Sequence, residues 1–376
     1  MELETLFSPR KIGNVKIKNR IVRSATYEKR ATKYGQVSED LINLYTDLAK
    51  GGTGLIITGA IAVDHRATGS QNQAYLYDES FIAGQRKLVK AVHEYSDVKI
   101  AAQIHHSGRQ GDHPKYETVA PSPIPHELTK RVPRKLTDNE IKEIIDKFVD
   151  AGRRAFESEY DMVQLHGAHG YLLSNFISRY TNKREDEYGG NILNQTKILV
   201  DIFKQLRGEV GKNFPITIKL QTQDCIPGGL TLEEAKEIIK ILVDTGYDAI
   251  EPSGGLIETM KDFTSKNILP SKVIKSSADE NYFLPTAKEL KPLMRETKLI
   301  LMGGIRNPLS AEKFLKKGIA DFISLSRPLI YEPNLPNRWK NGDLSPPLCV
   351  SCNSCYMTML KGTVYCVVKK RLETKK

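Results

Sequence analysis

The sequence predicts an α/β fold in which eight parallel strands alternate with helices and close into a (β/α)8 TIM barrel. Eight short, nearly continuous apolar runs alternate with amphipathic segments, the pattern of buried parallel strands with crossover helices. The length of 376 residues suits one such barrel with insertions. No Gly-x-Gly-x-x-Gly motif follows the first strand, which disfavours a doubly wound dinucleotide-binding sheet.

The elements follow one another in a regular order. A hairpin is expected first, over residues 11–18, with Gly13-Asn14 at its turn. The apolar runs then predict eight strands, over residues 19–26, 53–63, 99–106, 161–168, 215–221, 249–255, 298–304 and 320–327.

The segments between the strands carry helix start and stop residues. Capping boxes, with Thr first and Glu three residues later, are expected at residues 137–140, 231–234 and 286–289. Asn307-Pro308 supplies a cap followed by a first-turn proline. Helices are expected to stop near Gly52, Gly246 and Gly318.

The chain is expected to divide into two parts. Residues 1–345 form the barrel, and residues 346–376 form a cysteine-bearing tail. Two long connections, over residues 107–136 and 256–285, would emerge at the C-terminal face of the barrel. Active sites of barrels form at that face, so these loops are candidate walls of a substrate site.

Composition narrows the class of partner. The net charge is +11, but the basic residues are spread along the chain, so we expect neither a nucleic-acid nor a membrane partner. No apolar run of eighteen residues exists, and the N-terminal ten residues lack the apolar core of a secretory signal. The expected location is cytoplasmic, and a homo-oligomer is compatible with the sequence.

Two strand ends carry residues suited to a phosphate group. Gly303 and Gly304 would let backbone amides approach an anion closely, and Arg327 after Ser326 would add a charged contact. The loops after the last two strands are a recurrent phosphate site of this fold. The alternative is a tight turn and a surface arginine.

Two further polar residues are expected at the barrel mouth. Gln103 offers both a donor and an acceptor, which suits an imide edge. Lys219 offers a positive charge, which suits an electron-rich ring that acquires negative charge. Either residue could instead be structural.

The segment from His166 to Tyr171 concentrates candidate catalytic groups at the end of the fourth strand. His166 and His169 could ligate zinc, although no acidic third ligand stands in the same segment. Two imidazoles can instead hydrogen-bond a carbonyl oxygen and polarise it, while the neighbouring phenol of Tyr171 supplies a proton.

These motifs together resemble the Old Yellow Enzyme family of FMN-dependent oxidoreductases, particularly the barrel domain of bacterial 2,4-dienoyl-CoA reductase. The resemblance covers nearly the whole chain. Its markers, in order, are Asn19-Arg20-Ile21-Val22, Gly54-Leu55-Ile56-Ile57, Gln103, His106-Ser107-Gly108-Arg109, the segment from His166 to Tyr171, Asp186-Glu187-Tyr188-Gly189-Gly190, Gly303-Gly304 and Ser326-Arg327.

The resemblance implies a role for each candidate residue. Cofactor contacts to FMN are implied for Ala25, Thr26, Ala60, Gln103, Lys219, Met302, Gly303, Gly304, Ser326 and Arg327. His166 and His169, with Tyr27, would contact the substrate, and Tyr171 would donate a proton.

The resemblance also implies the reaction. NADH or NADPH would reduce FMN, and FMN N5 would pass hydride to the activated C=C bond of an α,β-unsaturated carbonyl or enoyl thioester, with protonation by Tyr171. The alternative is a flavin and iron–sulfur dehydrogenase, for an amine or similar substrate, that passes electrons to an external acceptor.

The cysteine tail bears on that alternative. Cys349, Cys352, Cys355 and Cys366 resemble the [4Fe-4S] ligand set of larger relatives. Four thiolates can hold a cubane cluster or a tetrahedral zinc ion, and unmetallated thiols are a third possibility.

Overall fold

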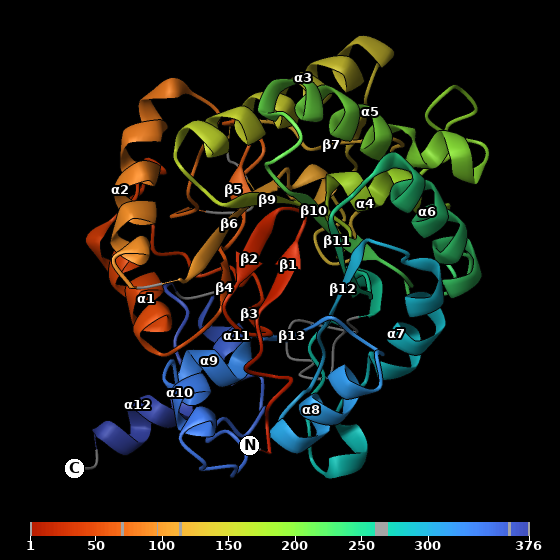
Figure 1. Ribbon diagram of the computed structural model, residues 1–376. Helices are drawn as coiled ribbons and strands as arrows, with labels where there is room; N and C mark the ends of the chain where they lie inside the picture. The colour runs from red at the N-terminus through yellow and green to blue at the C-terminus, as the bar shows by residue number, and fades with distance from the viewer. Residues whose placement is uncertain are drawn as a thin grey trace.

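The computed structural model describes residues 2–68, 71–95, 97–112, 115–259, 270–359 and 362–374. Eight parallel strands pair in chain order and the last pairs with the first, so the sheet is closed (Figure 1). The predicted TIM barrel is thereby confirmed. Its strands are β3 (Ile21–Arg23), β4 (Leu55–Ile57), β6 (Lys99–His105), β9 (Met162–Gly167), β10 (Ile216–Gln221), β11 (Ala249–Ser253), β12 (Lys298–Leu301) and β13 (Phe322–Leu325).

Helices surround the strands as an outer layer in Figure 1. Those between successive strands are α1 (Glu39–Lys50), α2 (Ile82–His93), α3 (Asp138–Glu157), α4 (Leu172–Ile177), α5 (Ile192–Val210), α6 (Leu232–Thr245), α7 (Leu284–Leu290) and α8 (Pro308–Lys316). After the last strand come α9 (Arg327–Tyr331), α10 (Leu335–Lys340), α11 (Ser354–Thr358) and α12 (Val367–Glu373).

The predicted helix starts are confirmed with one exception. The capping boxes of Thr137 and Thr231 are formed, and Asn307 caps α8. The box expected at residues 286–289 is wrong, because α7 begins at Leu284 and Thr286 lies inside it. Pro285 is tolerated only in a first turn, which fixes the start of α7 ahead of the threonine.

The half of the barrel interior at the N-terminal ends of the strands is filled with apolar side chains. The expected hairpin is present as β1 (Arg10–Ile12) and β2 (Val15–Ile17), and it lies across one end of the barrel (Figure 1). Its Ile12 and Ile17 belong to the apolar cluster inside the barrel. Above them pack residues from all strands but β10, namely Val22, Leu55, Ile57, Ala101, Met162, Ala249, Ile300 and Phe322. Polar side chains that could form a site inside the barrel are therefore confined to the opposite, C-terminal end.

The long connections contain short elements. The first includes a 3-10 turn at Gly108–Gln110 and β7 (Val119–Ala120), which pairs with β8 (Arg134–Lys135). The second includes 3-10 turns at Ile257–Thr259 and Ser277–Asp279. The remaining short pieces are β5 (Ile61–Ala62) and 3-10 turns at Glu79–Phe81 and Lys291–Leu293. In the described part of the chain, no helix combines the length and apolar character that crossing a bilayer requires.

Candidate active site

A layer of polar side chains, the polar layer, lies inside the barrel between the apolar cluster and the C-terminal ends of the strands. Side chains alternate along a strand, so a residue two positions after a member of the apolar cluster also points into the barrel. Gln103 follows Ala101 in this way, Gln164 follows Met162, and Glu251 follows Ala249. The C-terminal half of the barrel interior is therefore hydrophilic.

Lys219 is held in this layer by a buried carboxylate. Its Nζ lies 3.0 Å from Glu251 Oε2 and donates to Ser24 Oγ at 2.9 Å. Glu251 is fully buried and also accepts hydrogen bonds from Ser24, Ser324 and Gln164 at 2.8, 2.8 and 3.1 Å. Burial alone would raise the pKa of Glu251, but Lys219 and the hydroxyl donors hold that pKa below its ordinary value.

Gln103 belongs to the same network. Its Nε2 donates to Gln164 Oε1 at 2.7 Å, and Gln164 in turn donates to Glu251. The two predicted mouth residues, Gln103 and Lys219, are thus joined through Gln164 and Glu251. Neither connecting residue was predicted as a site residue from the sequence.

The predicted histidines and tyrosine form one cluster above the polar layer. The ring centroids of His166 and His169 lie 5.2 Å apart, and those of His166 and Tyr171 lie 4.9 Å apart. His169 has a left-handed backbone, with φ of 64°, and its Nε2 lies 2.6 Å from Ser253 Oγ. That turn brings the second imidazole back over the barrel mouth beside the first.

The environment keeps these groups uncharged near neutral pH. Burial, reinforced by the neighbouring His105, lowers the pKa of His166 well below its usual range. Burial and the charge of Lys219 lower the pKa of His169 to about 3. Burial raises the pKa of Tyr171 to about 12, so its phenol keeps its proton. The cluster therefore offers neutral hydrogen-bonding groups and one protonated phenol.

A zinc ion at His166 and His169 lacks further ligands. Within the residues that the structure describes, no three His, Cys, Asp or Glu side chains are grouped to hold a metal ion. The hydrogen-bonding role is the one this geometry favours.

The ends of β3, β12 and β13 line a second cavity, next to the polar layer. Ser24, Met302, Gly303, Gly304, Ser326 and Arg327 all contribute to its wall. The backbone amides of Gly303, Gly304 and Ser326 donate no hydrogen bond to any described residue. Unpaired amides converging on a cavity are suited to an anion.

The two glycines are required by packing as well. Gly303 has φ of 102° and Gly304 has φ of 77°, both in the left-handed region. A Cβ on Gly303 would lie 2.5 Å from the ring of Phe283, and one on Gly304 would lie 2.8 Å from the ring of Tyr282. The rings of Phe283 and Tyr282 therefore exclude a side chain at either glycine, while the two backbone amides remain available to a ligand.

Arg327 lies at the boundary between this cavity and the cysteine tail. It is buried, and its Nη1 donates to the carbonyl of Lys272 at 2.7 Å and to that of Ser351 at 3.2 Å. The guanidinium therefore links the cavity wall to the loop that contains Cys349 and Cys352.

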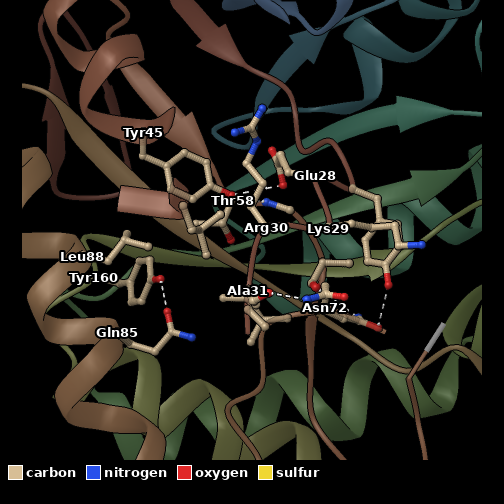
Figure 2. Close-up of a pocket in the computed structure, with 17 residues that line it drawn as sticks. Glu28, Lys29, Arg30, Ala31, Tyr45, Thr58, Asn72, Gln85, Leu88 and Tyr160 are labelled. Carbon is tan, nitrogen blue, oxygen red and sulfur yellow. Dashed lines mark hydrogen bonds between the residues drawn. The ribbon is translucent and has the colours of Figure 1, made fainter. Parts of the chain in front are cut away.

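The remaining predicted contacts, Ala25, Thr26, Tyr27 and Ala60, lie along the segments that follow β3 and β4. Thr26 Oγ1 is 2.9 Å from Ser326 Oγ, and Ala25 packs beside the interior apolar cluster. Ala60 and Tyr27 line a small pocket, shown in Figure 2, together with the buried Glu28.

Figure 2 shows how that pocket is organised. The hydroxyl of Tyr45 donates to Glu28 Oε2 at 3.3 Å, and Tyr160 donates to Gln85 at 2.7 Å. Arg23 lies 3.5 Å from Glu28 Oε1, yet burial still raises the pKa of Glu28 to about 7. This carboxyl was not predicted from the sequence.

The four tail cysteines are not joined in disulfides in the described part of the chain. The amide of Ser351 donates to Cys349 Sγ at 3.4 Å, and Ser351 and Asn353 both have left-handed backbones. Burial, reinforced by Cys349, raises the pKa of Cys355 to about 11. As the side chains lie, the thiols are not gathered as a ligand set among the described residues.

Comparisons with known proteins identify the family. Residues 5–344 match the model of the NADH:flavin oxidoreductase / NADH oxidase family. A similar protein is "NADH oxidase" from Thermoanaerobacter brockii, 38% identical over 353 residues that are 93% of this chain and 52% of that protein. The chain thus spans about half the length of that relative.

Solved structures show the same relationship. The complex of 2-naphthoyl-CoA reductase with 2-naphthoyl-CoA superposes with a TM-score of 0.89 at 28% identity, over 98% of this chain and 57% of that one. The old yellow enzyme homologue from Zymomonas mobilis superposes with a TM-score of 0.76 at 27% identity, over 92% of this chain and 96% of that one.

Proposed function

The chain belongs to the NADH:flavin oxidoreductase / NADH oxidase family, and on that premise we propose that it reduces the activated C=C bond of α,β-unsaturated carbonyls or enoyl thioesters. As a member of this family it is an oxidoreductase that uses FMN and a nicotinamide reductant. The observation that carries the proposal is the neutral cluster of His166, His169 and Tyr171 above the polar layer.

The residues at the mouth suit FMN. The unpaired amides of Gly303, Gly304 and Ser326 would hold the phosphate, with Arg327 at the same wall. Lys219 would face the pyrimidine end of the ring with its charge fixed by Glu251. When bound, FMN supplies the hydride chemistry.

The chain itself supplies orientation and a proton. His166 and His169 would hydrogen-bond the carbonyl oxygen of the substrate, which draws electron density from the β carbon. Tyr171, whose phenol keeps its proton through neutral pH, would protonate the α carbon. The relative solved with 2-naphthoyl-CoA supports thioesters as one substrate class.

An anaerobic assay tests this function. The FMN-loaded protein is mixed with NADH or NADPH and a panel of enones and enoyl-CoA thioesters, and oxidation of the nicotinamide is followed. We expect turnover that requires the alkene. Reduction of the flavin without any alkene-dependent reoxidation would contradict the proposal.

We further propose that the tail holds an iron–sulfur cluster on Cys349, Cys352, Cys355 and Cys366. The amide of Ser351 donating to Cys349 Sγ is the kind of contact that clusters receive, and left-handed residues such as Ser351 and Asn353 occur in loops that turn their amides toward an anion. The thiol side chains would have to close on the cluster.

Metal analysis tests the tail separately. Anaerobically purified protein should contain iron and acid-labile sulfide, and Cys355→Ser should lose both. The exposed Cys225, which lies outside the tail, provides the control variant Cys225→Ser. Zinc without sulfide, or a metal-free protein, would contradict the cluster.

A further inference from the structure

The backbone of His169 is held on both sides by amide side chains. Its N–H donates to Gln221 Oε1 at 2.8 Å, and its carbonyl accepts from Gln110 Nε2 at 2.7 Å. Gln221 is fully buried and is the last residue of β10. The imidazole therefore has a fixed place, and what it offers to a ligand depends on which ring nitrogen carries the proton.

Ser253 contacts one of the two ring nitrogens of His169. It is fully buried at the end of β11 and pairs in register with Gln221. Because it lies two residues after Glu251 of the polar layer, its side chain also points into the barrel. Its Oγ lies 2.6 Å from His169 Nε2, and among the described residues this nitrogen is the only hydrogen-bond partner of the hydroxyl.

The direction of this hydrogen bond follows from the number of available partners. A hydroxyl has one proton to donate, and a buried proton without an acceptor is costly. If Nε2 of His169 donated to Oγ, the hydroxyl proton of Ser253 would have no acceptor among the described residues. The hydroxyl therefore donates to Nε2, and the proton of the neutral imidazole lies on Nδ1.

The other ring nitrogen of His169 is available to a ligand. The residue is partly exposed, Nδ1 is not completely buried, and none of the described residues hydrogen-bonds to it. His166 reaches the complementary state differently, since the amide of Ala168 donates to its Nδ1 at 3.4 Å and leaves the proton on Nε2. Each ring therefore carries its proton on the nitrogen that no described residue contacts by a hydrogen bond.

We infer that Ser253 is a positioning residue that keeps His169 in the Nδ1–H tautomer, so that this imidazole donates a hydrogen bond to the carbonyl oxygen of the substrate. The inference rests on the proposed function, in which His169 binds that oxygen. A carbonyl oxygen only accepts hydrogen bonds, so the opposite tautomer would place two lone pairs face to face. Ser253 acts through the ring and does not itself bind the substrate.

Nitrogen NMR measures the tautomer directly. Oxidised, FMN-loaded protein labelled with 15N-histidine is compared with Ser253→Ala near neutral pH, and the signals of His169 are assigned from their loss in His169→Asn. We expect a protonated Nδ1 in the wild-type protein and a protonated Nε2, or a mixture of tautomers, in Ser253→Ala. Ser80→Ala, at an exposed position in the 3-10 turn ahead of α2, should match the wild-type protein. A protonated Nε2 in the wild-type protein, or an unchanged tautomer in Ser253→Ala, would overturn the inference.

A double-mutant cycle tests the consequence for binding. The ligand is cyclohex-2-enone, and its dissociation constant is measured on the oxidised, FMN-loaded protein by titration of the flavin absorbance. Ser253→Ala should weaken binding about fivefold or more. His169→Asn suits the left-handed backbone and supplies an amide donor that has no tautomer to fix. In that background, Ser253→Ala should change the affinity by less than about twofold.

Structural and positioning roles give different results in this cycle. Equal weakening by Ser253→Ala in both backgrounds would mean that the hydroxyl only supports packing, and it would overturn the inference. Melting temperature and FMN content establish that each variant folds. If the tautomer and the cycle behave as expected but the wild-type protein reduces no alkene, the proposed function fails while the positioning role of Ser253 stands.

Discussion

Lys219 and Glu251 form a buried ion pair inside the barrel, with 3.0 Å between Nζ and Oε2. Neighbouring strands β10 and β11 present them at the same register position. The side chains are 3% and 0% exposed, so neither charge is hydrated. In the proposed function, the pair would fix a positive charge beside the ring of FMN, and Glu251 would position Lys219.

Removal of the carboxylate should be destabilising. Glu251→Gln leaves the ammonium of Lys219 buried without a counter-charge, which should lower the free energy of unfolding by about 3 kcal/mol or more. Denaturant unfolding measures the loss. Glu233→Gln, at an 80% exposed side chain, should change stability little. A Glu251→Gln variant as stable as Glu233→Gln would show that the charge of Lys219 does not depend on this partner.

Loss of the phenol should separate the two half-reactions. Tyr171→Phe removes the proposed proton donor and keeps the ring packing against His105 and His166, so reoxidation of the reduced flavin by an enone should slow by about 10²-fold or more. Reduction by the nicotinamide, measured by stopped-flow absorbance, should be unchanged. Equal slowing of both steps would point to a disturbed site instead.

The pKa values predict how alkene reduction depends on pH. Tyr171 titrates near 12 and His169 near 3, so neither group changes charge between pH 5 and pH 9. The rate of flavin reoxidation by an enone should therefore be nearly independent of pH across that range. A sigmoidal change with a midpoint near 6.5 in the wild-type protein would mean that His166 or His169 is hydrated and titrates normally.

The cavity lined by Gly303, Gly304 and Ser326 should not tolerate a side chain at Gly303. Gly303→Ala adds a Cβ 2.5 Å from Phe283 in a left-handed conformation, so both folding and FMN retention should suffer, with a stability loss of about 2 kcal/mol. Gly318→Ala, where φ is 65° but nothing lies within 4 Å, measures the backbone strain alone. We expect Gly318→Ala to retain FMN and Gly303→Ala to lose it, as measured by flavin fluorescence after dialysis.

Glu28 should make stability depend on pH in the acid range. Its pKa is about 7 in the folded chain against about 4.5 when unfolded, so the folded state binds more protons between these values. Its contribution is complete below about pH 4.5 and is lost as the pH rises through 7. Relative to Glu28→Gln, the wild-type protein should lose up to about 1.4 kcal/mol per pH unit there.

Unfolding curves at several pH values test that slope. Glu296→Gln, at a fully exposed carboxyl, should run parallel to the wild-type protein throughout. A Glu28→Gln variant that also runs parallel would mean that Arg23 keeps Glu28 ionised, against the direction of its pKa shift.

Local patterns predicted the barrel because they act over short distances along the chain. Apolar runs, the boxes of Thr137 and Thr231 and the cap of Asn307 each depend on residues within one turn. The error at Thr286 has the same origin, since the pattern matched while Pro285 set the start of the helix. Strand ends such as the segment from His166 to Tyr171 stood out because polar residues there interrupt an apolar run.

Glu251 and His105 did not stand out in the same way. Glu251 lies inside an apolar strand and has partners directly after β3 and in β9, β10 and β13, and His105 lies beside His106 at the end of β6. The sequence by itself determined the barrel, its strand order and the motifs at its C-terminal end. Only the tertiary structure decided which side chains meet inside, because closure of the barrel brings together residues far apart in the chain, and strand register sets their height.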